Sequence, residues 1–260
     1  MLVIGEKINV ISKTLGTAMK ERNKGPIQEM ATLQVEAGAH LLDLNLGPAT
    51  KNGPELMAWL VETVQEATPD VRLSLDTMNS EAMEAGLKLC RNRPMINSTT
   101  AERARLETFL PMARVYEADI IALAMTETGV SRDCNERIMA AAGIIAAMME
   151  FDVPLERVYL DPLLLPVGVA QQQAKEAMDA IEMFKELNDP PLKTVVGLSN
   201  IYNGCPEDVK SPLAATLLTM LMCRGLDAAI MDPMDVALMT AKKTVDVFTN
   251  ETLYCHAYLD

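Results

Sequence analysis

The stretch Leu73-Ser74-Leu75-Asp76 is a short, mainly apolar run that ends on a single carboxylate. The same form recurs at Met95 to Asn97, at Val158 to Asp161 and at Val195 to Asn200. Runs rich in Val, Ile and Leu without strict alternation are typical of strands buried on both faces, as in a parallel sheet that helices cover. If these runs are consecutive strands of one barrel, their polar ends meet at one rim.

Eight such runs occur along the chain, and each is expected to form a strand. They are Leu2 to Gly5, Leu41 to Asn45, Val71 to Asp76, Met95 to Ser98, Ile120 to Met125, Val158 to Asp161, Thr194 to Ser199 and Ala228 to Asp232.

Stretches with helical character separate these runs. They are Ile27 to Ala37, Glu55 to Glu66, Ser80 to Cys90, Glu102 to Tyr116, Asn135 to Glu150, Ala174 to Leu187, Leu213 to Cys223 and Val236 to Phe248. Pro26 and Pro54 suit the first turn of a helix, where a missing N–H costs little, whereas Gly38 and Gly225 are typical of residues that follow a helix end. Strand and helix therefore alternate eight times.

This alternation predicts an α/β protein with a single (β/α)8 TIM barrel. The chain has 260 residues, of which 49% are hydrophobic, so it can bury a large core. A barrel of this kind takes roughly 250 residues without a second domain. We therefore expect one domain over residues 1–260, with the segments 162–173 and 201–211 as long loops where function is built.

The charge balance disfavours a polyanionic partner. The formal net charge is -13 at pH 7. Nucleic-acid binding depends on Lys and Arg side chains that neutralise phosphates, so we expect no nucleic-acid partner.

The cysteines and the N-terminus predict a cytoplasmic protein. The cysteines are odd in number and include no CxxC pair, which fits reduced thiols better than disulfides or a zinc site; they are Cys90, Cys134, Cys205, Cys223 and Cys255. The sequence from Met1 to Glu6 lacks the basic and long apolar regions of a signal peptide, and no later run is long enough to span a bilayer without charges. We expect neither secretion nor membrane insertion.

Short polar side chains are predicted to form a ring where the strands end. In a parallel barrel the carboxyl ends of all strands face one pocket. The residues concerned are Glu6, Asn9, Asn45, Asp76, Asn97, Asp161, Ser199, Asn200 and Asp232. The ring contains carboxylates and amides, with no histidine and no cluster of basic residues.

These residue types favour a neutral heterocycle that carries several N–H groups, because a carboxylate can accept two parallel hydrogen bonds from an N–H and an adjacent amino group. A phosphate site would need Lys, Arg or a glycine-rich turn, and the predicted rim shows neither a GxGxxG nor a P-loop match. We expect no metal site, since His40 falls at the opposite, stability face of the barrel and His256 lies near the C-terminus.

Each rim residue also has a plainer interpretation. An Asp or Asn after a strand often caps a helix or forms an Asx turn, and Asp76 before Thr77 could be such a cap. Asn203 and Gly204 are expected to form a plain turn, and Cys205 to be a bystander thiol. Capping does not explain why so few basic residues occur at the strand ends, so the ring as a whole favours a binding site.

Several strings in this order resemble those of the methyltetrahydrofolate:corrinoid methyltransferases. The resemblance covers nearly the whole chain, and the strings are Gly5-Glu6-Lys7-Ile8-Asn9, Leu42-Asp43-Leu44-Asn45, Leu75-Asp76-Thr77, Met95-Ile96-Asn97-Ser98-Thr99, Leu160-Asp161-Pro162, Gly197-Leu198-Ser199-Asn200 and Gly225-Leu226-Asp227-Ala228-Ala229-Ile230.

The resemblance implies a TIM barrel that binds the pterin of tetrahydrofolate or 5-methyltetrahydrofolate as substrate. A methyl group would be exchanged with the cobalt of a cobalamin, or corrinoid, that a separate corrinoid protein carries. By this likeness Asp76, Asn97 and Asp161 hold the pterin edge, and Asp161 takes the fork of N3–H and the 2-amino group. The remaining residues implied to line the pocket are Glu6, Asn9, Gly197 and Ser199. The family is also expected to form homodimers.

Asn200 matches the family asparagine that contacts N5, the atom bearing the methyl group. A departing tertiary amine would become a strongly basic anion unless a proton or hydrogen bond relieves its charge. We expect the Asn200 amide to do this through a hydrogen bond that strengthens in the transition state, while the proton comes from solvent. The segment from Ile201 to Val209 departs from the family pattern, which leaves partner choice and substrate detail open.

Two rival functions remain. A dihydropteroate synthase shares the barrel and the pterin pocket but must hold a diphosphate leaving group, and the predicted strand ends lack the required cations. A non-catalytic folate-binding or corrinoid-docking module is the other alternative, against which the presence of Asn200 argues. The sequence chooses neither the direction of methyl transfer, nor the corrinoid partner, nor the original methyl donor.

Overall fold

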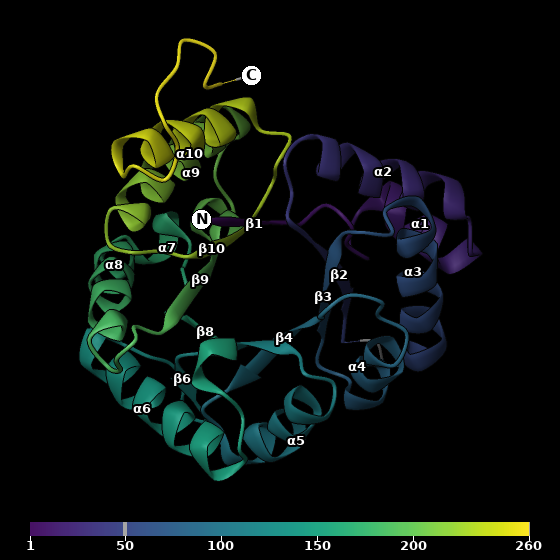
Figure 1. The fold of residues 1–260 in the computed structure, drawn as a ribbon, viewed down its shortest axis with the longest axis horizontal. Helices are drawn as coiled ribbons and strands as arrows, with labels where there is room; N and C mark the ends of the chain where they lie inside the picture. The colour runs from purple at the N-terminus through teal and green to yellow at the C-terminus, as the bar shows by residue number, and fades with distance from the viewer. Residues whose placement is uncertain (49–50, 260) are drawn as a thin grey trace.

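Eight parallel strands close into a barrel in the computed structural model, which describes residues 1–48 and 51–259 (Figure 1). Around the barrel the order of strands is β1, β10, β9, β8, β5, β4, β3 and β2, and β1 pairs with β10 to close the ring. Their bounds are β1 (Leu2–Gly5), β2 (Leu41–Gly47), β3 (Arg72–Thr77), β4 (Met95–Thr100), β5 (Asp119–Leu123), β8 (Val158–Asp161), β9 (Lys193–Gly197) and β10 (Ala228–Met231).

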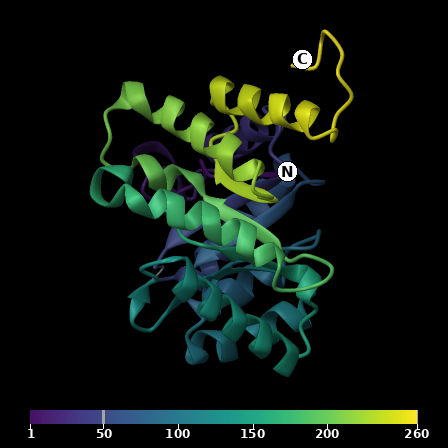
Figure 2. The same cartoon turned by 90° about the vertical axis from the view of Figure 1, so that its left-hand side faces the viewer.

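Helices surround the barrel, as Figures 1 and 2 show from two directions. The α-helices are α1 (Lys13–Glu21), α2 (Lys24–Glu36), α3 (Gly53–Ala67), α4 (Ser80–Leu87), α5 (Arg103–Val115), α6 (Cys134–Glu150), α7 (Val167–Ala170), α8 (Gln172–Lys185), α9 (Glu207–Met222) and α10 (Val236–Phe248), and two short 3-10 helices are η1 (Leu155–Arg157) and η2 (Leu198–Tyr202). Side-chain caps start five of them, because an Asn, Asp or Ser oxygen accepts an otherwise unpaired N–H of the first turn; the caps are Ser12, Asn23, Asn79, Asp133 and Asp235.

The predicted TIM barrel is confirmed, and each of the eight predicted strands is present. Two strand ends were placed wrongly. The seventh strand stops at Gly197, and Ser199 lies in η2. The fifth stops at Leu123, and Met125 pairs with Val130 in a small antiparallel hairpin formed by β6 (Met125–Thr126) and β7 (Gly129–Val130).

Two helical segments extend beyond the prediction. Helix α1 was not predicted, although Ser12 caps it and Leu15, Ala18 and Met19 bury one narrow face. Helix α9 begins at Glu207, so the expected long loop over 201–211 is largely helical. The segment 162–173 likewise contains α7 and the first residues of α8. The connections after the sixth and seventh strands are therefore more ordered than their sequences indicate.

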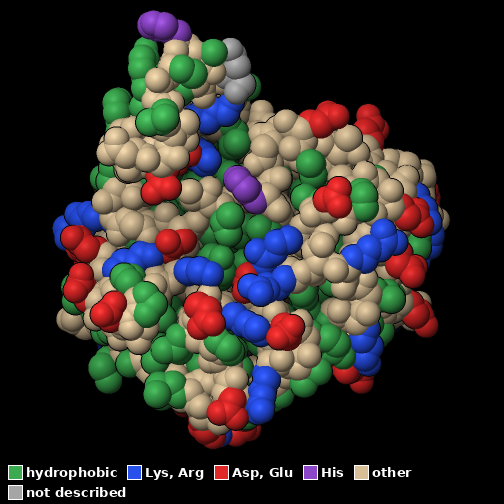
Figure 3. Space-filling model, in the orientation of Figure 1, with side chains coloured by type: hydrophobic (Ala, Val, Ile, Leu, Met, Phe, Trp, Pro, Cys, Tyr) green, Lys and Arg blue, Asp and Glu red, His purple; other side chains and the backbone are tan. Residues whose placement is uncertain are grey.

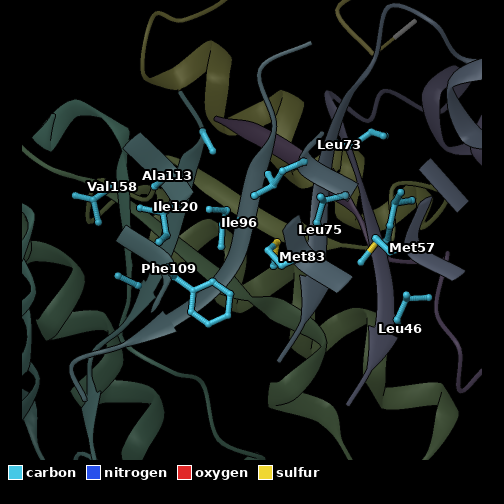
Figure 4. Close-up of a cluster of buried hydrophobic side chains, with 14 of the residues drawn as sticks. Leu46, Met57, Leu73, Leu75, Met83, Ile96, Phe109, Ala113, Ile120 and Val158 are labelled. Atoms are coloured by element: carbon cyan, nitrogen blue, oxygen red, sulfur yellow. The ribbon is translucent and has the colours of Figure 1, made fainter. Parts of the chain in front are cut away.

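The main core lies between the strands and the surrounding helices. Figure 4 shows part of it, with Leu75 and Ile96 from strands beside Met83 and Phe109 from helices. These side chains are all fully or almost fully buried. Burial of this apolar surface holds each helix against the sheet, at about 25 cal/mol per Å² removed from water.

A second apolar cluster fills the inside of the barrel and explains where the polar ring begins. Its members are Ile4, Leu41, Met95, Ile121, Tyr159, Val195 and Ala228. Strand residues two positions apart point to the same face. The next inward positions are therefore Glu6 after Ile4, Asn97 after Met95 and Asp161 after Tyr159, so the interior changes from apolar to polar within one step along the strands.

Basic and acidic side chains are interspersed on the surface. Figure 3 shows Lys and Arg side chains near the centre of one face, with Asp and Glu side chains among them. All five cysteines are free thiols. Within residues 1–48 and 51–259, no helix combines the length and the apolar composition that a bilayer crossing would require.

Candidate functional site

All eight predicted site residues line one pocket of about 1100 Å³ at the carboxyl end of the barrel. They are Glu6, Asn9, Asp76, Asn97, Asp161, Gly197, Ser199 and Asn200. Asn45 and Asp232, which the strand pattern also placed at the rim, line the same pocket. Residues from distant parts of the sequence thus meet because every strand points its end to the same side.

Several rim residues form Asx turns as well as lining the pocket. The side-chain oxygens of Asn9, Asn45 and Asp232 accept N–H groups two residues further on, at 2.9 to 3.0 Å. The plainer interpretation of such residues is therefore correct for one oxygen of each side chain. It is wrong for Asp76, because Asn79 caps the following helix and Asp76 instead accepts a hydrogen bond from the Asn45 amide.

Asp161 is almost completely buried at the end of β8. The Leu163 N–H donates to its Oδ1 at 2.7 Å, and the Gly197 backbone also donates to the carboxylate. Burial raises the pKa of Asp161 to about 7, against the lowering effects of these hydrogen bonds and of the nearby Arg137. The backbone turn thus holds Asp161 in place while the side chain lines the pocket.

Asp43, a carboxylate that was not among the predicted site residues, also lines the pocket. It accepts hydrogen bonds from Ser74 Oγ at 2.7 Å and from Asn97 Nδ2 at 3.0 Å. Burial raises the pKa of Asp43, and burial together with the Asp43 charge raises the pKa of Asp76. A neighbouring negative charge in a buried site disfavours ionisation, so this pair of carboxyls retains a proton more readily than exposed carboxyls do.

The signal for Asp43 was present in the sequence. Leu41, Asp43 and Asn45 share one face of β2 because side chains alternate along a strand, and Leu41 belongs to the inner cluster. A carboxylate between two leucines in a buried strand therefore points into the barrel. Only the last residue of this run, Asn45, was predicted to lie at the rim.

Glu6 lies at the end of β1 beside residues from the far end of the chain. Burial raises the pKa of Glu6 to about 7, a hydrogen bond from Ser199 lowers it, and the charge of Asp232 raises it. Lys7 Nζ donates to Asp232 Oδ2 at 2.8 Å. The rim therefore does contain a lysine, which the prediction overlooked, but its charge is paired with the Asp232 carboxylate.

Asn200 stands at the mouth of the pocket on η2. Its side chain is exposed and makes no hydrogen bond with the described residues, so it is available to a ligand. Gly197 lies directly beneath it, and a Cβ added at Gly197 would come within 3.0 Å of Asn200 Nδ2. The glycine therefore provides the space in which the amide sits.

The divergent segment 201–209 forms one wall of the pocket. Tyr202, Asn203 and Glu207 line it, together with Lys210. Asn203 and Gly204 form the expected turn, in which Cys205 N donates to Tyr202 O at 2.9 Å. Burial, and then the negative charges of Glu6 and Asp232, raise the pKa of Tyr202, so its hydroxyl stays protonated.

No group of metal-ligating side chains is found among residues 1–48 and 51–259. His40 lies just before β2, at the opposite end of the barrel from the pocket, and its Nδ1 accepts the Val3 N–H at 3.0 Å. Its position is therefore the structural one that the sequence predicted.

Comparisons with known proteins agree with this chemistry. Residues 8–232 match the family model described as pterin binding enzyme. The chain is 25% identical to the methylcorrinoid:tetrahydrofolate methyltransferase of Eubacterium limosum over 260 residues, covering 99% of this chain and 94% of that protein. It is 27% identical to the methionine synthase of Mycobacterium leprae (strain TN) over 240 residues, which are 88% of this chain but only 20% of that protein.

Solved structures share the fold. A 7,8-dihydropteroate synthase from Vibrio fischeri ES114 superposes with a TM-score of 0.72 at 16% identity, covering 97% of this chain and 94% of that chain. The dihydropteroate synthase of Xanthomonas albilineans with 4-aminobenzoic acid gives 0.70 at 17% identity, covering 95% and 92%. At such low sequence identity the similarity establishes the barrel fold only. The reaction must be argued from the residues of the pocket.

Proposed function

Because this chain belongs to the family of pterin-binding enzymes, we propose that its pocket binds tetrahydrofolate and exchanges a methyl group between N5 of the folate and the cobalt of a corrinoid. The corrinoid would be carried by a separate protein. The observation that carries this proposal is the ring of inward carboxylates and amides, with the unpartnered Asn200 amide at its mouth. The name of the Eubacterium limosum relative supports the same reaction.

Recognition of the pterin follows from the donors and acceptors of the ring. The ionised Asp161 carboxylate accepts the N3–H and the 2-amino group as a fork, while its backbone hydrogen bonds keep it oriented. Asn97 donates to Asp43 at 3.0 Å, which turns its amide oxygen toward another donor. Asp76 and the buried Asp43 share the adjacent part of the pterin edge. Glu6, Asn9 and Ser199 complete the wall.

Asn200 supplies the catalytic hydrogen bond in this proposal. In one direction the cobalt takes the methyl group as the N5–C bond breaks, and the nitrogen keeps the bonding electron pair and gains a proton from solvent. In the other, the N5 lone pair attacks the methyl group, and N5 loses its proton. The Asn200 amide donates to N5 as negative charge develops there, so it stabilises the transition state more than the bound substrate.

The pocket disfavours a dihydropteroate synthase. That reaction needs cations that hold a diphosphate, whereas the basic residues lining the described pocket are Lys7 and Lys210. Lys7 pairs with Asp232 at 2.8 Å and Lys210 with Glu207 at 2.5 Å. Both charges are thus already compensated, and the proposed methyl transfer requires no free cation.

The proposal is tested by mixing the purified protein with methylcobalamin and tetrahydrofolate under reducing, anaerobic conditions. We expect the corrinoid spectrum to change from the methylated to the demethylated form only when tetrahydrofolate is present. An unchanged spectrum with demonstrable folate binding would instead indicate a non-catalytic binding module. Formation of dihydropteroate from a pterin diphosphate and 4-aminobenzoate would indicate the synthase.

A homodimer in the cytoplasm belongs to the same proposal. Light scattering coupled to size-exclusion chromatography would test the dimer, for which the expected mass is twice that of one chain. The site serves both directions of transfer, so the direction used in the cell depends on the corrinoid protein and on metabolite levels.

A further inference from the structure

Two arginines lie behind the pocket and take no part in the proposed transfer. Arg137, on α6, is 0% exposed and is the largest fully buried side chain among the described residues. Arg105, on α5, is half-buried. Neither lines the pocket. Taking a guanidinium out of water is costly, and an apolar side chain of similar size would avoid that cost. The cations must therefore contribute something that packing alone does not.

Arg137 holds the segment that follows Asp161. Its Nε donates to the Pro162 carbonyl at 2.7 Å and its Nη2 to Gln173 Oε1 at 2.8 Å, while its Nη1 is buried without a partner among the described residues. Pro162 is the first residue after Asp161, and Gln173 lies in the first turn of α8. The guanidinium therefore joins the two ends of the connection after β8.

The peptide between Pro162 and Leu163 is held from both sides. Arg137 binds its carbonyl, and its N–H donates to Asp161 Oδ1 at 2.7 Å. Leu163 has a φ of 65°, a left-handed conformation that a bulky L residue rarely adopts. A turn of this kind persists only where the surrounding contacts fix it. Arg137 is one of those contacts, and the orientation of Asp161 depends on the turn.

Arg105 holds the backbone that follows another rim residue, Asn97. Its Nη2 donates to the Ser98 carbonyl at 2.6 Å, and Ser98 directly follows Asn97. The guanidinium carbon lies 4.5 Å from the centre of the Phe109 ring, which is labelled in Figure 4. Its Nε is buried and unpartnered in the described part of the chain. In both cases an arginine from a neighbouring helix donates to the backbone carbonyl of the residue that directly follows a predicted site residue.

We propose that Arg137 and Arg105 are positioning residues, which hold Asp161 and Asn97 in the geometry that recognises the ligand by fixing the backbone next to each of them. This inference rests on the proposed function, because it takes tetrahydrofolate as the ligand. It adds that recognition depends on two cations that never touch the folate.

Arg137 also acts on Asp161 through its charge. It lowers the pKa of Asp161, although burial raises that pKa more strongly. The other titratable groups that face the guanidinium are Glu176 on α8 and Asp133 and Cys134 at the start of α6. Since only the ionised Asp161 accepts the N–H groups of a pterin, affinity should fall as the pH drops below the Asp161 pKa. If the Arg137 cation is removed, this loss of affinity on the acidic limb of the pH profile should begin at a higher pH.

Two variants of Arg137 separate charge from geometry. For Arg137→Gln we expect the Kd for tetrahydrofolate, measured by calorimetry at pH 7, to rise about tenfold, and the acidic limb of the Kd profile to move to higher pH. Arg137→Lys keeps the charge but cannot bridge both partners, so its Kd should rise while the limb stays in place. Arg132→Gln removes an exposed guanidinium near the same end of α6 and serves as the control.

Wild-type Kd values and an unshifted pH profile in both Arg137 variants would overturn the inference. Should neither variant fold, Arg105→Met decides, with Arg103→Met on the exposed side of α5 as its control. The expected result is a Kd raised about tenfold in Arg105→Met alone, and equal binding by both would overturn the inference. If the wild-type protein does not bind tetrahydrofolate, the proposed function itself fails. If it binds and the variants bind equally well, only this inference fails.

Discussion

Asp161 combines two tasks in one side chain. One oxygen closes the turn to Leu163 at 2.7 Å, so the carboxylate is fixed before any ligand arrives. Burial raises its pKa to about 7, which leaves it poised between the charged and neutral forms near neutral pH. A raised pKa also means that the folded protein binds this proton more tightly than the unfolded chain. The ligand-free protein therefore carries a pH-dependent stability cost at its own binding site.

We predict that this cost appears in the free energy of unfolding. Because the folded-state pKa lies above the ordinary value of 3.8, the stabilising contribution of the Asp161 proton is fully present below that value and is lost as the pH rises through about 7. Asp161→Asn should therefore flatten the decline in stability between pH 5 and pH 8, by on the order of 3 kcal/mol. Urea unfolding of both proteins at these two pH values measures the difference, and parallel pH dependences would contradict the assignment.

Asn200 is the residue at which binding and turnover should separate. We predict that Asn200→Ala lowers kcat for methyl transfer about a hundredfold while the Kd for tetrahydrofolate changes less than about threefold. The reason is that the amide matters most when charge develops on N5. Asn203→Ala, another amide on the same pocket wall, is the control. An equal loss of binding and turnover in Asn200→Ala would rule out a role specific to the transition state.

Among the helices and strands, the ends of the strands determine which residues line the pocket. Sequence patterns give least information about where a strand ends. The eight strands were predictable because each is a short and mainly apolar run, and helix α10 was predicted with its observed bounds. The family resemblance seen in the sequence is confirmed by the match over residues 8–232. Helix η2 was missed, since tertiary contacts at Gly197 rather than local propensity end β9 there.

Arg137 and Arg105 show why the rest of the site was not predictable. Reasoning from strand ends finds side chains that face the pocket but misses those that do not line it, such as Arg137 and Arg105. Arg137 appears in the sequence as an ordinary helical residue, and only the packing of α6 against the segment 162–173 buries it. Partners that are far apart in the chain leave no local pattern.

The close approach of Gly197 to Asn200 yields a prediction for the junction of β9 and η2. Gly197→Ala places a Cβ 3.0 Å from Asn200 Nδ2, so the amide must move. We expect turnover to fall about tenfold with less than about 1 kcal/mol of lost stability. Gly143→Ala on α6, where the added Cβ meets nothing within 4 Å, should leave turnover unchanged. Full activity in Gly197→Ala would show that Asn200 needs no such space.

At the scale of the whole molecule, the barrel is a rigid support for a polar pocket in a protein of net charge -13. The apolar layer inside the barrel and the layer beneath the helices are separate clusters, and both lie below the ring of polar side chains. The C-terminal residues after α10 extend along the outside of the molecule (Figures 1 and 2). The pocket is thus built by the carboxyl end of one barrel.

Two phenylalanines test this division between core and surface. Phe109 is 1% exposed in the layer between helices and strands, whereas Phe248, at the end of α10, is 79% exposed. Phe109→Ala should cost about 3 to 5 kcal/mol of unfolding free energy, and Phe248→Ala less than about 0.5 kcal/mol. Chemical denaturation compares them directly. Similar losses in the two variants would mean that the core is not where the packing places it.

A crystal structure of the protein with tetrahydrofolate would test the proposed pterin site directly. We predict that the pterin ring lies inside the barrel mouth, with its N3–H and 2-amino group on Asp161 and its N5 within hydrogen-bond distance of the Asn200 amide. A ligand bound at the end of the barrel where the strands begin, or a mouth left empty at saturating folate, would contradict it.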